Sequence, residues 1–128
     1  MAETVVDSSV LIDYLRGREP AREYLETLQS ADELATHIIV AAEVLTGARD
    51  RREQDAILHA LREFQMHVVS EPDCSDALNS LVQFRLSNGV GWHDCLIAAT
   101  CLRKRLPVAT LDDKHFGVFE DLEVIRPY

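Results

Sequence analysis

The chain has few basic residues for its length. Its 128 residues include 13 Lys and Arg against 22 Asp and Glu, which gives a formal net charge of −9 at pH 7. A protein that holds nucleic acid by bulk positive charge shows the opposite balance. Any contact with nucleic acid must therefore come from a local site. The length fits a single domain spanning residues 1–128 and leaves no room for a second domain with its own core.

Paired cysteines and long apolar runs are also missing. The three cysteines, Cys74, Cys95 and Cys101, form no CxxC pair, and an odd number fits a reduced cytoplasmic protein better than a disulfide framework. We expect all three to be small core residues. Asp7 and Asp13 interrupt the N-terminal region before an apolar run can build up, so neither a signal peptide nor a membrane span is predicted.

Several motifs that would identify other enzymes are absent. The sequence has no GxGxxG, P-loop or GxSxG motif and no Cys/His zinc spacing. Dinucleotide-binding, P-loop nucleotidase, α/β-hydrolase and zinc-site interpretations are therefore set aside.

Short β-branched segments alternate with longer helical patterns along the chain. Strands are predicted at 4–6, 34–36, 66–69, 108–110 and 123–125. Helices are predicted after the possible caps Ser8 and Ser9, from Pro20, at 38–47, 51–64, 72–88 and 92–105, and a short helix or turn around Phe116 and Phe119. This order predicts an α/β fold with a central parallel sheet that helices cover on both faces.

Four acidic residues lie next to or within apolar segments, where a carboxylate needs a structural or functional reason. Asp7 and Asp112 each follow a predicted strand, and Asp94 begins an apolar helix. Each of these three could simply be a capping or turn residue. Glu43 interrupts an apolar helix, where an ionised carboxylate must be paired, protonated or bound to a cation. The alternative is that Glu43 lies at the solvent edge of that helix or pairs with an arginine.

Together, the four acids predict a metal site. Sites in parallel sheets form beyond the carboxyl ends of the strands, where Asp7 and Asp112 are expected. Clustered carboxylates repel one another unless a divalent cation compensates them. Ligation by oxygen alone suits Mg²⁺ or Mn²⁺. Phosphodiester hydrolysis with one or two metal ions is the chemistry that such a site favours.

The residues around these acids carry a family resemblance. The segments VVDSSVLIDYLRG, AAEVLTGA, HDCLIAA and ATLDDKHF, in this order, resemble the sequence blocks of PIN-domain ribonucleases, and are most similar to those of VapC toxins from toxin–antitoxin pairs. The resemblance implies a three-layer α/β/α sandwich. It also implies an acidic pocket that binds Mg²⁺ or Mn²⁺ and cleaves RNA. The catalytic and metal-binding residues that it implies are Asp7, Glu43, Asp94 and Asp112, with Ser8 and Thr110 orienting the acids or a water molecule.

The resemblance leaves three nearby residues open. Many relatives carry Asn at the position of Asp112, and the adjacent Asp113 is an alternative ligand. His93 precedes Asp94 but lies outside the family pattern, so a role in proton transfer is open. We expect His115 to be a packing residue, because Mg²⁺ avoids imidazole ligands.

The same resemblance implies a homodimer, an RNA substrate and a cognate VapB-type antitoxin that offers an arginine to the acidic pocket. RNA would need a local group of cations on this acidic chain. The candidates are Arg16, Arg18, Arg49, Arg51, Arg52 and the basic run 103–105.

Two rival interpretations belong to other functional classes. A response-regulator receiver has a similar length, but it needs an acid pair after its first strand and an Asp after its third. Here Ser8 follows Asp7, and Ser70 follows the predicted third strand. The second rival is a catalytically silent scaffold of the same fold that binds a partner. Titration with metal discriminates, because a ligand that binds only the folded state must raise the melting temperature.

Overall fold

The computed structural model describes residues 3–128 and contains a five-stranded parallel sheet. The strands are β1 (Thr4–Val6), β2 (Leu34–His37), β3 (Gln65–His67), β4 (Val108–Ala109) and β5 (Val124–Ile125). Their spatial order is β3-β2-β1-β4-β5, so β1 is the central strand. The chain first builds outward from β1 to β3 and then crosses back to place β4 on the other side of β1. The carboxyl ends of β1 and β4 therefore border the switch point, where open parallel sheets form their sites.

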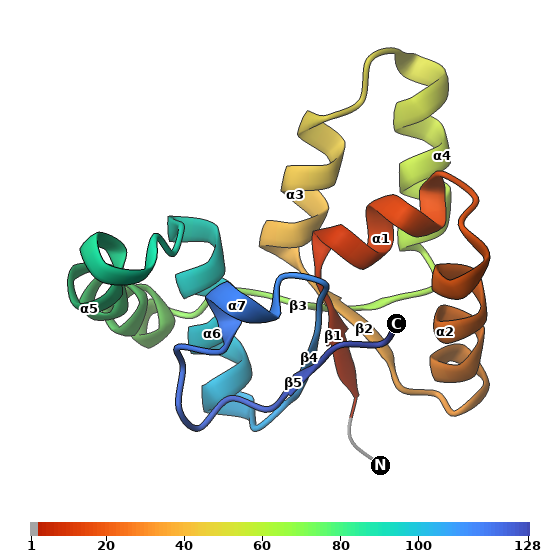
Figure 1. The fold of residues 1–128 in the computed structure, drawn as a ribbon. Helices are drawn as coiled ribbons and strands as arrows, with labels where there is room; N and C mark the ends of the chain where they lie inside the picture. Colours follow the sequence, from red (N-terminus) through yellow and green to blue (C-terminus); the bar gives the residue numbers. More distant parts are fainter. Residues whose placement is uncertain (1–2) are drawn as a thin grey trace.

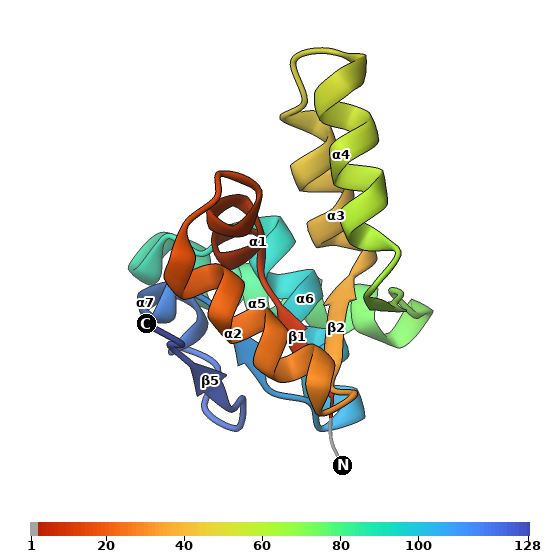
Figure 2. The same ribbon diagram turned by 90° about the vertical axis from the view of Figure 1, so that its right-hand side faces the viewer.

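The helices lie on both faces of this sheet. They are α1 (Ser8–Leu15), α2 (Glu19–Ser30), α3 (Ile38–Thr46), α4 (Arg51–Leu61), α5 (Glu71–Asn88), α6 (Trp92–Lys104) and α7 (Asp113–Phe116). Figure 1 shows α2 on one side of the strands and α6 on the other, while α3 and α4 form a helical hairpin that projects beyond the rest of the molecule. Figure 2 shows the same projecting hairpin from the side. The predicted α/β sandwich is confirmed.

The element boundaries depart from the sequence prediction by a few residues. The helix predicted to reach residue 64 ends at Leu61, because Gln65 already pairs with Ala35 of β2 and the chain needs three residues to turn into β3. The strand expected at 66–69 accordingly occupies Gln65–His67. The N-cap residue of the first helix is Asp7, and not Ser8 or Ser9.

The core gathers around α6, which is the most deeply buried helix. All seven residues from Cys95 to Cys101 are buried, as a helix that is apolar on every side requires. Val5 and Val6 of β1 pack into the same core with no exposed surface. The expectation that all cysteines are core residues is wrong for Cys74, which lies on the exposed side of α5. No helix within residues 3–128 has the length and apolar character to cross a membrane.

Candidate metal centre

Asp7 is a buried carboxylate at the end of the central strand. It occupies the N-cap position of α1, but its side chain makes no capping hydrogen bond. Its Oδ2 accepts a 2.8 Å hydrogen bond from Thr110 Oγ1, and only 5% of the residue is exposed. Burial raises the pKa of Asp7 to about 6, and the nearby Asp94 and Glu43 carboxylates add to the rise. Asp7 is therefore more than the capping residue that its position allowed.

Two hydroxyl side chains hold the end of β4 against Asp7. Thr110 Oγ1 donates to Asp7 and accepts a 2.9 Å hydrogen bond from the Asp112 backbone N–H. Ser9 Oγ accepts from the Leu111 N–H at 3.0 Å and lies 3.5 Å from Asp7 Oδ2. Thr110 thus makes the contact that its predicted supporting role requires.

The hydroxyl group that contacts Asp7 on this helix is that of Ser9. The backbone N–H of Ser8 lowers the pKa of Asp7, while the turn of α1 carries the Ser9 side chain over the end of β4; the supporting role of Ser8 stays a prediction. Two adjacent serines gave no signal in the sequence to distinguish them.

Asp94 lies in the first turn of α6, at the edge of the buried core. Its Oδ2 accepts a 3.2 Å hydrogen bond from the Gly91 N–H, so one of its functions is the capping that its position predicted. Burial raises the pKa of Asp94, and the Asp112 carboxylate adds to the rise. The residue therefore caps its helix while it faces a second carboxylate.

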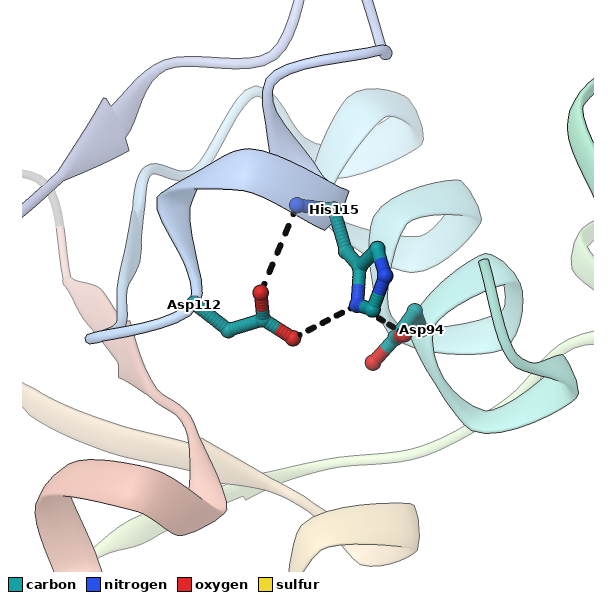
Figure 3. Close-up of side chains that lie close together, drawn as sticks. All are labelled: Asp94, Asp112 and His115. Carbon is teal, nitrogen blue, oxygen red and sulfur yellow. Dashed lines mark hydrogen bonds and ion pairs between the residues drawn. The ribbon is translucent and has the colours of Figure 1, made fainter. Parts of the chain in front are cut away.

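Asp112 and His115 complete a cluster with Asp94, shown in Figure 3. Asp112 caps the short helix α7, and its Oδ2 lies 2.8 Å from His115 Nδ1. The same nitrogen lies 3.9 Å from Asp94 Oδ2. One ligand atom from each of the three residues falls within 4.8 Å of the others.

His115 was expected to pack rather than to bind metal; its ring also hydrogen-bonds to Asp112, and its absence from the metal ligands stays a prediction. The spacing of three residues between Asp112 and His115 was the available signal, since residues i and i+3 are neighbours on a helix.

The solvent exposure of Glu43 differs most from the sequence prediction. The apolar sequence around it predicted a carboxylate in apolar surroundings, but 40% of its side chain is exposed. The reason is that α3 projects beyond the sheet in the hairpin with α4, so only Val40, Ala41 and Val44 are buried (Figure 1). The solvent-edge alternative describes its burial correctly. Glu43 still faces the site, because its Oε1 lies 4.0 Å from His93 Nδ1 of α6 and its charge raises the pKa of Asp7.

The two adjacent acids after β4 point to different partners. Asp113 Oδ1 accepts a 3.2 Å hydrogen bond from Arg126, near the end of the chain. Asp112 instead joins His115 and Asp94. The geometry therefore favours Asp112 over Asp113 as the fourth site acid.

The donor set of this centre fits a hard divalent cation. Among residues 3–128, no basic side chain forms an ion pair with Asp7, although its carboxylate is nearly enclosed and faces other acids. An ionised Asp7 would therefore lack the compensation that a buried carboxylate needs. A cation bound to carboxylate oxygens would supply it, and Mg²⁺ and Mn²⁺ prefer such ligands.

Fold and site together define a class: small parallel α/β domains with a carboxylate centre at the switch point of the sheet. A family model described as the PIN domain matches residues 4–121. The chain belongs to the PIN-domain family. The resemblance inferred from the sequence is confirmed, and the receiver alternative is excluded.

Named relatives narrow this assignment to the VapC group. Ribonuclease VapC10 of Mycobacterium tuberculosis is 36% identical over 122 residues, which are 93% of this chain and 90% of the relative. Ribonuclease VapC19 of the same organism is 30% identical over 123 residues, 93% of this chain and 96% of the relative.

Solved structures agree with this fold. A toxin–antitoxin complex from Klebsiella pneumoniae matches 98% of both chains with a TM-score of 0.78 and 26% identity. VapBC2 from Rickettsia felis, bound to a DNA fragment from its promoter, matches 97% of both chains with a TM-score of 0.79 and 19% identity. At that lower identity the likeness is one of fold alone.

Proposed function

We propose that the protein is a Mg²⁺- or Mn²⁺-dependent endoribonuclease toxin, which cleaves RNA phosphodiester bonds and is neutralised by a VapB-type antitoxin. The observation that carries the proposal is the cluster of Asp94 and Asp112 beyond the end of β4, to which Asp7 is linked because Thr110 bonds to both Asp7 and the Asp112 backbone and because the charge of Asp94 raises the pKa of Asp7. The similarity to ribonucleases VapC10 and VapC19 supports the reaction class.

Asp7, Glu43, Asp94 and Asp112 are the residues that would hold the cation. Bound there, Mg²⁺ or Mn²⁺ would stabilise negative charge on the phosphate and make a water molecule more acidic. The chain's own contribution is to hold the carboxylates in place. Thr110 fixes Asp7 through its hydroxyl group, and the Gly91 N–H fixes Asp94. His115 fixes Asp112 through its ring, and we assign it this positioning role rather than ligation.

The binding of RNA depends on basic side chains that are free to contact its phosphate groups. Four of the eight predicted candidates already have a partner in the chain: Arg18 pairs with Asp13, Arg49 with Glu53, Arg103 with Asp73, and Lys104 with His67. Arg16 forms no ion pair with any of residues 3–128, and it lines a cavity of about 560 Å³ between α1, α3 and α4 that also reaches Glu43. Arg16 is therefore the cation best placed to hold RNA beside the site.

A row of exposed apolar side chains on α5 is the evidence for the proposed homodimer. Leu78, Val82 and Leu86 are 55%, 77% and 99% exposed and lie four residues apart along one face of the helix, and α5 itself lies at the edge of the molecule (Figure 1). The helix has no charged residue between Asp76 and Arg85. On a chain with a net charge of −9, such a face is where a second copy can approach without repulsion. The row is symmetric about Val82, so a twofold axis there would place Leu78 against Leu86 of the partner.

The antitoxin is proposed on two grounds. The Klebsiella pneumoniae structure, at 26% identity, is a toxin–antitoxin complex. The acidic centre would also attract a guanidinium group, which binds carboxylates in a bidentate fork. Such a contact predicts that neutral variants of the site acids weaken antitoxin binding as well as cleavage. We expect this complex to form in the cytoplasm.

The test is cleavage of a small-RNA pool by purified protein with Mg²⁺ or Mn²⁺, beside EDTA. Asp94→Asn should abolish cleavage, while Asp55→Asn, which removes an exposed charge on α4, should not. Hydrolysis should leave 5′-phosphate and 3′-hydroxyl ends. Cleavage that survives both EDTA and Asp94→Asn would contradict the proposal. Absence of cleavage together with no metal-induced rise in melting temperature would identify a silent scaffold instead.

A further inference from the structure

A second polar cluster lies inside the molecule, away from the acidic centre. Three polar residues of this cluster are fully buried: His37, which ends β2 and caps α3, Thr100 in α6 and Asp73 in α5. His37 Nε2 lies 2.9 Å from Thr100 Oγ1, and Thr100 Oγ1 lies 2.7 Å from Asp73 Oδ2. Arg103 closes the cluster with two hydrogen bonds to the Asp73 carboxylate, of 2.7 and 2.9 Å. We call these four residues the inner network.

The hydrogen bonds of the inner network have one consistent direction. The Ile39 N–H donates to His37 Nδ1 at 3.0 Å, so in the neutral ring Nε2 carries the proton. That proton is donated to Thr100 Oγ1, and the Thr100 hydroxyl group is then free to donate to Asp73. Every buried side-chain nitrogen and oxygen atom of residues 3–128 has a partner. A satisfied buried network of this kind rigidifies and specifies the elements that it joins.

The network joins the two helices that carry Glu43 and Asp94. Glu43 follows His37 by six residues, and Thr100 follows Asp94 by six. At 1.5 Å per residue, each acid lies about 9 Å along its helix from the network. The helices run in opposite directions (Figure 1), and they meet again at the site, where Glu43 Oε1 is 4.0 Å from His93 Nδ1. The His37–Thr100 hydrogen bond at one end of the two helices therefore bears on the placement of Glu43 beside His93 at the other end.

We propose that the inner network is a positioning device for the metal centre, in which His37, Thr100 and Asp73 fix α3 against α6 and so set the separation of Glu43 from Asp94. The proposal rests on the proposed function for the role of those acids. Exposed Glu43 needs such a device, because apart from the 4.0 Å contact with His93 no ion pair among residues 3–128 holds its carboxylate. Groups that hydrogen-bond directly to metal ligands typically change metal affinity by 10- to 100-fold when they are replaced; because the inner network acts through two helices, we expect an effect at the lower end of that range.

The decisive variants are at Thr100. Thr100→Val keeps the shape of the side chain but removes the hydroxyl group that joins His37 to Asp73, whereas Thr100→Ser keeps it. Leu25→Ala, in the buried face of α2, supplies a control that loses stability without touching the network or the cavity beside Glu43. Arg103→Lys supplies a milder second variant, because it keeps the charge beside Asp73 but loses the paired hydrogen bonds.

Two readouts separate positioning from general stability. The first is the Mn²⁺ concentration that gives half of the maximal rise in melting temperature. We expect Thr100→Val to raise it about 10-fold, Arg103→Lys to raise it less, and Thr100→Ser and Leu25→Ala to leave it unchanged. The second is the backbone amide chemical shift of Glu43 and Asp94 without metal, which should move in Thr100→Val and return in Thr100→Ser.

The outcomes are distinct. Unchanged metal affinity and amide shifts in a folded Thr100→Val protein would reduce the inner network to a packing element and overturn the proposal. If Thr100→Val does not fold, unchanged values in Arg103→Lys would overturn the proposal in the same way. A wild-type protein whose melting temperature does not respond to Mn²⁺ would refute the proposed function instead, and the amide shifts would still decide the positioning role.

Discussion

Thr110 Oγ1 donates a 2.8 Å hydrogen bond to Asp7 Oδ2 and thereby joins the carboxyl ends of β4 and β1. This bond favours the ionised carboxylate, but burial and the neighbouring acids oppose ionisation more strongly. Without a cation, an ionised Asp7 therefore destabilises the folded protein.

The first prediction follows from that conflict. Between pH 3.8 and about 6 the folded protein keeps the Asp7 proton that the unfolded chain has lost, so Asp7 lowers stability as the pH rises through this window. In EDTA at pH 7, Asp7→Asn should therefore raise the free energy of unfolding, by about 3 kcal/mol at most. Below pH 4 the gain should vanish. Urea unfolding of both proteins from pH 3.5 to 7.5 measures the difference.

Metal should reverse the ranking of these two proteins. Mn²⁺ should stabilise the wild type but not Asp7→Asn, because binding to the folded state alone adds stability. Asp55→Asn is the matched control and should follow the wild type at every pH. An Asp7→Asn protein that is no more stable than the wild type in EDTA at pH 7 would show that the buried charge carries no cost.

The second prediction concerns the dimer. A carboxylate at the centre of the apolar row on α5 would face its own copy across the twofold axis, where like charges repel. Val82→Glu should therefore convert a dimer into a monomer in analytical ultracentrifugation at micromolar concentration. Gln54→Glu makes the same change in charge on exposed α4 and should leave the mass unchanged. A dimeric Val82→Glu protein would place the interface elsewhere.

The site shows how far the sequence alone reaches. Asp7 and Asp112 were predictable because each follows a strand, and the carboxyl ends of parallel strands meet at one edge. The exposure of Glu43 was not predictable, because its apolar neighbours say nothing of a hairpin that projects from the sheet. The hydrogen bond of His115 to Asp112 was not predicted, because the helix α7 that places the two side chains together is only four residues long.

The inner network was equally invisible before the structure. His37, Asp73 and Thr100 lie 27 to 63 residues apart, and each taken singly has an ordinary place in a cap or a helix. Only the packing of α3, α5 and α6 brings them together. Local patterns predict elements and strand ends, whereas contacts between distant helices depend on how those elements pack.

The third prediction concerns Arg16 and RNA. In the inactive Asp94→Asn background, Arg16→Ala should weaken RNA binding and should flatten the dependence of log K on log salt by about 0.7, the value for one phosphate contact on a single strand. Arg62→Ala, at the far end of α4 from the cavity, should change neither quantity. Fluorescence anisotropy across a salt series measures both. Equal slopes for all three proteins would mean that Arg16 makes no phosphate contact.

The fourth prediction concerns the response of His37 to acid. Burial lowers the pKa of His37 to about 4, although the Asp73 carboxylate opposes the shift. Between pH 6.5 and 4 the unfolded chain gains a proton at this residue that the folded protein refuses, so stability falls as the pH falls through this window. Protonation would also remove the Nδ1 lone pair that caps α3. His37→Asn keeps a capping oxygen but does not titrate. Between pH 6.5 and 4, the free energy of unfolding of the wild type should therefore fall by about 3 kcal/mol at most relative to that of His37→Asn. Urea unfolding measures the difference. Parallel pH profiles for the two proteins would contradict the burial of a neutral His37.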